Sequence, residues 1–134
     1  MFYAFDITIP KSTTKSSPIT QLLKLTAGIV TWVGIQFPSG CWGLAHCYLW
    51  HRGHQWLPTN PEGDFSSNGY VIPIVEYYEL GEALNIVKFV GWNLDDTWGH
   101  TITVYIDILP KEALEPDSLL KSGLKRLLQL VGVG

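Results

Sequence analysis

The feature of this chain that most constrains its fold is an alternation of apolar and polar residues with a period of two. It is clearest in HTITVYIDILP at residues 100–110, where every second side chain from position 102 to 108 is isoleucine or valine. Successive side chains of a β-strand point to opposite faces of a sheet, so this pattern predicts a strand with one face against a core. YAFDITIP at residues 3–10 repeats the pattern and stops at a proline, and ITQLLKLT at 19–26 is a weaker example.

Two other runs carry apolar residues on both faces. They are GIVTWVGIQFP at residues 28–38 and ALNIVKFVGWN at 83–93, and we expect them to be central strands or strands with a covered outer face. QWLP and YVIPIVEYYEL are further strand candidates, but each contains a proline, Pro58 or Pro73. Proline lacks the N–H that a central strand donates, so these two strands are predicted at edges or bulges.

Turn residues separate these runs, and no helical period interrupts them before Pro110. About eight short strands at this spacing are typical of a β-sandwich. We therefore predict an all-β fold, an antiparallel and jelly-roll-like β-sandwich, over residues 1–110, which is within the size of a single domain.

The segment after Pro110 has a different period and forms a separate C-terminal tail, residues 111–134. Apolar residues recur there at helical spacing, and Lys121, Lys125 and Arg126 lie on the opposite side. This pattern predicts a short amphipathic helix. We expect its apolar stripe to contact another subunit; the stripe consists of Leu120, Leu124, Leu127 and Val131.

The composition limits the classes of partner. Charged residues make up only 16% of the chain, against roughly 25% in an average soluble domain, so some apolar surface is expected to contact another molecule. The net charge of −3 does not favour nucleic acid, which usually binds a basic face. No run approaches the roughly 18 apolar residues of a membrane helix, and MFYAFDITIP lacks the pattern of a secretory signal. We expect protein subunits as partners, and neither nucleic acid nor membrane.

The stretch CWGLAHCYLWHR at residues 41–52 holds two cysteines, two histidines and two tryptophans. In a strand, Ala45, Cys47 and Leu49 would share one face, which is small and apolar enough for a core. Cys47 is therefore predicted to be buried, and Cys41, which follows a glycine in a turn, to be more accessible. Two cysteines six residues apart in a strand are too distant for a disulfide, so we expect free thiols.

No motif in the sequence indicates a reaction. His51 and His54 can approach each other across a turn, but no further ligand stands at a recognised zinc spacing. The acidic pairs at residues 62–64 and 95–96 are interpreted as turn caps. No phosphate-binding loop, nucleophile elbow or dinucleotide fingerprint occurs. We expect a protein that is not an enzyme and has neither a cofactor nor a metal.

The aromatic residues raise two binding hypotheses, because tryptophan and tyrosine are enriched at interfaces. The equal alternative is that Trp50 and Trp92 belong to a second core layer beneath a loop or the tail helix. The first hypothesis is a protein interface on the other face of the 41–52 strand, formed by Trp42, His46, Tyr48 and Trp50. The second is a carbohydrate-binding module, whose candidates are Trp42, Trp50, Trp56, Trp98, Asp95 and Asp96.

Two stretches, GIVTWVGIQFPSGCWGLAHCYLWHRGHQWLPTNPEGDF and VGWNLDDTWGHTITVYI, resemble the small β-sandwich or jelly-roll virion proteins of tailed bacteriophages. The resemblance covers roughly residues 19–110 and carries no catalytic residues. It implies a capsid decoration or cement protein, or a tail accessory protein, that is assembled in the host cytoplasm and resides in the virion. We expect a structural assembly protein of this kind, with carbohydrate binding as the alternative.

Overall fold

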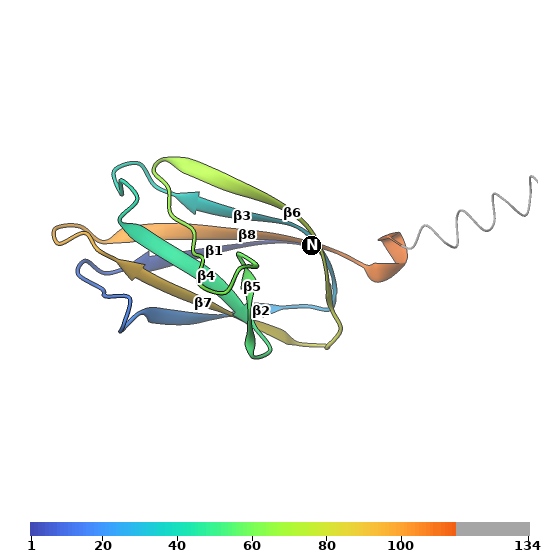
Figure 1. Cartoon of the computed structure of the whole chain (residues 1–134). Helices are drawn as coiled ribbons and strands as arrows, with labels where there is room; N and C mark the ends of the chain where they lie inside the picture. The colour runs from blue at the N-terminus through green and yellow to red at the C-terminus, as the bar shows by residue number, and fades with distance from the viewer. Residues whose placement is uncertain (115–134) are drawn as a thin grey trace, which may run out of the picture.

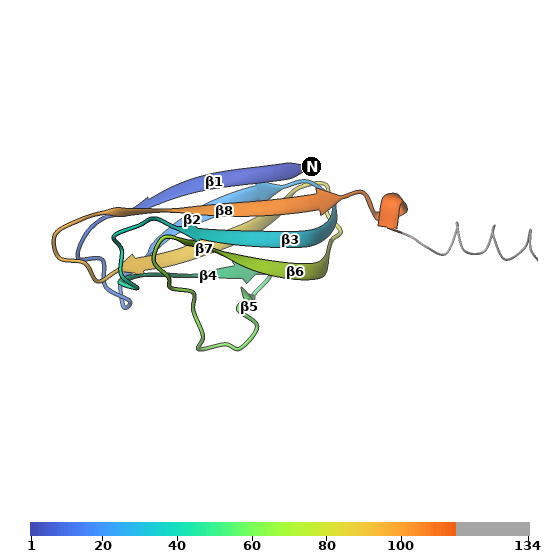
Figure 2. The same ribbon diagram turned by 90° about the horizontal axis from the view of Figure 1, so that it is seen from above.

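The computed structural model describes residues 1–114, in which eight antiparallel strands form two four-stranded sheets packed face to face (Figures 1 and 2). One sheet has the order β1-β8-β3-β6 and the other the order β2-β7-β4-β5. This confirms the predicted all-β sandwich. The strands are β1 (Phe2–Ile9), β2 (Ile19–Leu25), β3 (Gly28–Phe37), β4 (Ala45–His51), β5 (His54–Leu57), β6 (Tyr70–Leu80), β7 (Asn85–Asn93) and β8 (His100–Leu109).

The strand pairing follows one rule along the chain. β1 pairs with β8, β2 with β7, β3 with β6 and β4 with β5, and successive pairs lie in alternate sheets. The chain is thus arranged as a long double strand wrapped around the core. The β4–β5 hairpin lies at its tip, where Arg52 and Gly53 both have positive φ angles, as a tight hairpin turn requires.

The core lies between the sheets and is built by the alternation seen in the sequence. In β8 the isoleucines and valine at positions 102, 104, 106 and 108 are buried, and their neighbours are not. β3 and β7 are inner strands, as predicted from their apolar residues on both faces. β5 and β6 are edge strands, as predicted from Pro58, which directly follows β5, and from Pro73 in β6.

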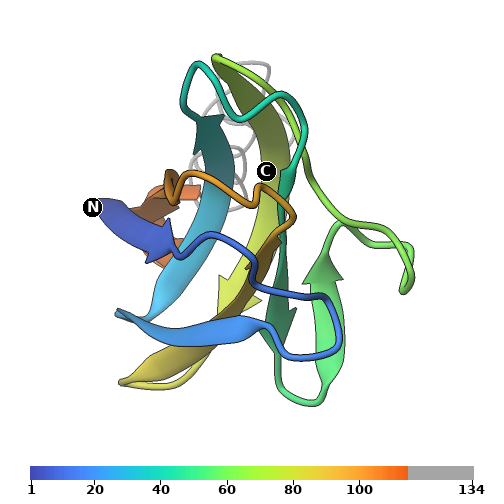
Figure 3. The ribbon, with the colours of Figure 1, turned by 90° about the vertical axis from the view of Figure 1, so that its left-hand side faces the viewer.

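The connections gather at the two ends of the sandwich (Figures 1 and 3). Residues 10–18, 38–44 and 94–99 lie together at one end, which we call the loop end, and residues 58–69 run along β4, where Phe65 and Cys47 form a bridge, before they join this end at Asn68 and Gly69. The short turns and the 3-10 turn η1 (Lys111–Leu114) lie at the other. The predicted tail helix, with its stripe of leucines and valine, falls outside the described residues. Among residues 1–114, no helix is long and apolar enough to span a membrane.

Candidate functional site

The four connections of the loop end are held to one another by backbone hydrogen bonds. The N–H of Ser12 donates to the carbonyl of Asp95 at 2.8 Å, and the N–H of Leu94 donates to the carbonyl of Leu44 at 2.9 Å. The N–H of Gly69 donates to the carbonyl of Pro38 at 3.1 Å. Bonds that cross between loops restrict the motion of each loop, so the backbone that carries the side chains of this end is held in place.

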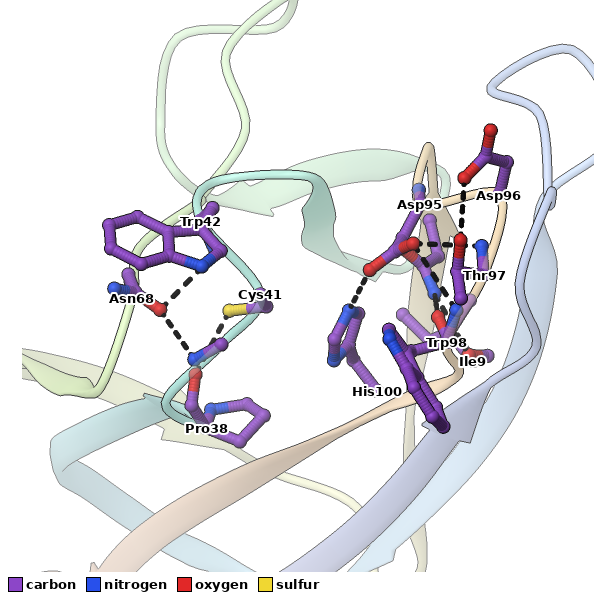
Figure 4. Close-up of polar contacts among 12 residues, drawn as sticks. Ile9, Pro38, Cys41, Trp42, Asn68, Asp95, Asp96, Thr97, Trp98 and His100 are labelled. Carbon is purple, nitrogen blue, oxygen red and sulfur yellow. Dashed lines mark hydrogen bonds and ion pairs between the residues drawn. The ribbon is translucent and has the colours of Figure 1, made fainter.

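Trp42 projects from this end and is 77% exposed. Its φ angle is +48°, a left-handed conformation that costs an L-residue about 1–2 kcal/mol. The side-chain oxygen of Asn68 holds this backbone, because it accepts the N–H of Gly40 at 2.8 Å and that of Trp42 at 3.2 Å (Figure 4). The loop thus holds the Trp42 backbone in a strained conformation, and in this conformation the indole ring is exposed.

Cys41 lies beneath this turn and corrects one prediction. It is fully buried rather than accessible, and its sulfur lies 3.1 and 2.9 Å from the carbonyl oxygens of Pro38 and Ser67, either of which can accept the thiol proton. Cys47 is buried as predicted, and both cysteines are free thiols. Burial raises the pKa of the Cys47 thiol, and the charge of Asp64 raises it further. Neither cysteine is placed as a reactive nucleophile.

Trp98 is the second exposed tryptophan of the loop end and is 68% exposed. The Asp95 carboxylate accepts the N–H groups of Thr97 and Trp98 at 2.9 and 3.2 Å and the Nε2–H of His100 at 2.8 Å (Figure 4). The bond from Thr97 and then the bond from His100 lower the pKa of Asp95. This confirms that the acidic pair at 95–96 caps a turn.

The six residues predicted for sugar binding are not brought together. Trp56 is only 4% exposed and packs against Tyr78 with ring centroids 4.8 Å apart, so the expectation of an open ring there is wrong. Asp95 is buried, and its oxygens are used within the turn. Trp50 lies on β4, away from the loop end. Figure 4 shows Trp42 and Trp98 on separate loops, with their rings apart rather than in one platform.

The predicted face of the 41–52 strand exists and is partly covered. His46, Tyr48 and Trp50 alternate along β4 and are half-buried. His46 stacks on Trp92 with centroids 5.3 Å apart, and its Nδ1 lies 2.7 Å from the Asp64 carboxylate. Trp42 precedes β4 and belongs to the loop end, so the structure separates it from the other three.

A shallow hollow of about 510 Å³ opens beside Tyr48 and Trp92. The Lys88 ammonium lies 5.7 Å from the Trp50 ring centroid, and that of Lys15 lies 5.3 Å from the Trp92 ring centroid. These lysines cover aromatic faces that would otherwise be open to a ligand. The hollow is lined by Lys15, Tyr48, Gln55, Glu62, Gly63 and Trp92.

Sequence reasoning missed a third surface, on the outer side of the β1-β8-β3-β6 sheet. Phe2, Val75 and Tyr77 are exposed there, and Trp32 and Tyr105 lie beside them, half-buried. The sequence did contain a signal for this surface, because apolar side chains that alternate with the core positions of a strand must face outward. In β1 and β8, Phe2 and Tyr105 occupy the positions that alternate with the buried residues.

The histidines do not assemble a metal centre in the part of the chain that the structure describes. His51 and His54 do approach across the hairpin, with ring centroids 6.5 Å apart. His51 Nδ1 instead lies 2.6 Å from the Tyr78 hydroxyl, and burial, followed by the charges of Arg52 and His54, lowers the pKa of His51. Among residues 1–114, no group of three or more His, Cys, Asp or Glu side chains could hold a metal ion.

Comparison with known proteins yields no relative: no family model matches the chain, and no curated protein sequence matches it.

Proposed function

We propose that this protein is a non-enzymatic structural subunit of a virion, a capsid decoration or cement protein or a tail accessory protein. It is assembled in the host cytoplasm and acts by binding other protein subunits, either further copies or a major capsid or tail protein. The loop end is the proposed contact, with Trp42 and Trp98 as its anchors.

The strand order supports this class of protein. Eight strands that pair first with last, in two sheets, match the wrapped double strand of a jelly roll. Jelly rolls occur in viral capsid domains and also in lectins and cupins, so the fold narrows the function without deciding it.

The observation that carries the proposal is the pair of exposed tryptophans on fixed loops. Tryptophan is the residue type most enriched among side chains that dominate protein–protein binding energy. Binding also costs the entropy of ordering loops. The hydrogen bonds made by Asn68 and Asp95 already order these loops in the free protein, so less entropy is lost when a partner binds. A strained backbone at Trp42 is expected where exposure of its ring serves recognition.

Carbohydrate binding is a second candidate, favoured by the exposure of Trp42 and Trp98 and of Asp96 beside the latter. Its support is weaker, because Trp56 and Asp95 are buried and the two exposed rings lie on separate loops. A bound sugar would therefore stack on only one of these two rings.

Solution mass tests the proposal. We expect the full chain to self-associate with increasing concentration in sedimentation velocity, and the double variant Trp42→Asn, Trp98→Asn to weaken this by roughly 30-fold or more, as for loss of a dominant anchor. Asparagine tolerates the left-handed conformation, so the fold is retained. The matched control is Leu84→Asn, which removes an exposed apolar side chain at the opposite end.

Two results would contradict the proposal. One is a wild-type protein that stays strictly monomeric at every accessible concentration and binds no other protein subunit. The other is saturable binding of a saccharide that quenches the indole fluorescence and is lost in the double variant, which would favour the carbohydrate-binding alternative.

A further inference from the structure

The outer face of the β1-β8-β3-β6 sheet carries a row of side chains that crosses all four strands. Strand pairing places Phe2 opposite Asp107, Asp107 opposite Trp32 and Trp32 opposite Val75. Val75 is 88% exposed, Phe2 is 61% exposed, and Tyr77 on the same side of β6 is 65% exposed. Clusters of large apolar side chains in contact with water usually mark an interface.

The centre of this face is flat and aromatic. The Trp32 ring lies over Gly34, where an added Cβ atom would come within 2.4 Å of the ring. Phe2 stacks on Trp32 with centroids 6.5 Å apart and lies 5.7 Å from the Tyr105 ring. We call the surface formed by Phe2, Trp32, Val75, Tyr77 and Tyr105 the Trp32 face.

The charges of this sheet have one sign. Its four strands contain no lysine or arginine, and the acidic residues on its outer side are Asp6, Asp107 and Glu79, which pairs with Lys111. A partner with an apolar stripe and a positive net charge would suit this sheet, because long-range attraction between opposite charges favours the encounter of the two molecules even where the charges do not touch.

The chain's own C-terminal segment, residues 115–134, has this chemistry in its sequence. Leu120, Leu124, Leu127 and Val131 recur at helical spacing. After Asp117 the charged residues are only Lys121, Lys125 and Arg126.

The length of this segment and the place where it begins also fit. In a helix, residues 118–131 would span about 20 Å, and a ten-residue strand spans about 33 Å, so the stripe fits along the sheet. η1 follows β8 and is tied to this sheet by the Lys111 ammonium, 3.2 Å from the Glu79 carboxylate. It projects past the strand ends in the direction in which β8 runs, away from the face of its own sheet (Figures 1 and 2).

We propose that residues 115–134 of one copy dock on the Trp32 face of a second copy. The contact joins two different surfaces, so a pair of molecules that exchange their tails satisfies both faces in a closed dimer. This proposal does not rest on the loop end, because neither Trp42 nor Trp98 belongs to the Trp32 face.

The test uses full-length variants and sedimentation velocity. Val75→Lys should weaken self-association at least about tenfold, because it places an ammonium against the apolar stripe and adds a positive charge that the net positive residues 118–131 repel at longer range. Val75→Glu is the matched control: it is equally polar, and it should weaken association less. Position 75 is almost fully exposed, so both variants should fold.

Variants of the tail complete the test. Leu124→Asp, within the stripe, should weaken association at least about tenfold, whereas Gln129→Asp, on the opposite side of the predicted helix, should not. Mixing Val75→Lys with Leu124→Asp should restore a 1:1 complex, because the first retains an intact tail and the second an intact face.

Three results would overturn the docking. The first is unchanged self-association in both Val75→Lys and Leu124→Asp. The second is failure of the mixture to associate although each variant alone is impaired. The third is a wild-type monomer in which Leu124→Asp increases hydrogen exchange at Trp32, which would place the tail on its own sheet. If the Trp42 and Trp98 variant loses association while the tail and face variants keep it, the docking fails and the proposed function stands.

Discussion

At the scale of single residues, the Asp95 carboxylate links the turn that carries Trp98 to the start of β8. Its pKa is lowered chiefly by the Thr97 N–H and the His100 ring. A carboxyl group whose pKa is lower in the folded than in the unfolded state stabilises the fold fully above its ordinary value near 3.9, and the contribution is lost as pH falls through the lowered value. We therefore expect the wild-type melting temperature to fall below about pH 4, and Asp95→Asn to lower it at pH 7 and weaken that acid dependence.

Calorimetry between pH 7 and pH 2 measures both effects. Asp96→Asn is the matched control, because Asp96 is exposed and its bond goes to the Thr97 hydroxyl rather than to the backbone. Equal behaviour of the two variants would mean that the bonds of Asp95 contribute nothing to stability.

At the scale of elements, the loop between β3 and β4 depends on one side chain from another loop. Asn68→Ala removes the acceptor of two backbone N–H groups, at Gly40 and Trp42. We expect a loss of about 1–2 kcal/mol in unfolding free energy, because each lost hydrogen bond is worth roughly 0.5–1.5 kcal/mol and these are at the surface. The Trp42 indole resonance should also broaden or shift in NMR spectra, since its backbone is no longer fixed.

The conservative variant separates the hydrogen bonds from other effects of position 68. Asn68→Asp keeps an oxygen acceptor and should retain most of the stability and the indole resonance. If Asn68→Ala leaves both unchanged, the left-handed conformation of Trp42 does not depend on Asn68.

The strands were largely predictable from sequence, because burial in a sandwich imposes a period of two that each strand displays by itself. Alternation located β1 and β8, and two prolines marked β5 and β6 as edges. Which side chains of β5 face the core was not predictable. The register shifts between Leu49 and Trp50, opposite β5, and both Trp56 and Leu57 are buried although they are adjacent.

The candidate surfaces were less predictable, because exposure depends on segments that are distant in sequence. Cys41 is buried by the carbonyl groups of two loops, one of them 26 residues away. The Trp32 face was not predicted, because the sequence pattern of a strand with an apolar outer side is the same whether another layer covers that side or not. Trp42 and Trp98 were named as candidates, but their fixed position at one end required the fold.

At the scale of the whole molecule, the two proposed contacts lie on different parts of the sandwich. The loop end is one pole, and the Trp32 face is the outer side of one sheet, whose strands run from that pole to the end where η1 begins (Figure 1). A subunit with contacts on an end and on a flank can bind two neighbours at once, which is the geometry an assembly subunit requires.

This arrangement implies that folding and assembly are separable. The buried core of residues 1–114 comes from the eight strands and the Cys41 turn, and η1 buries none of its residues. Truncation after Leu114 should therefore leave a cooperative sandwich whose melting temperature changes by only about 3 °C, which is roughly 1 kcal/mol or less for a domain of this size. The same truncation should weaken self-association at least about tenfold, since it removes the segment that docks on the Trp32 face and leaves the loop end as the remaining contact. Calorimetry and sedimentation velocity on one sample measure both outcomes. A truncated chain that no longer unfolds cooperatively would show instead that residues 115–134 belong to the core of their own subunit.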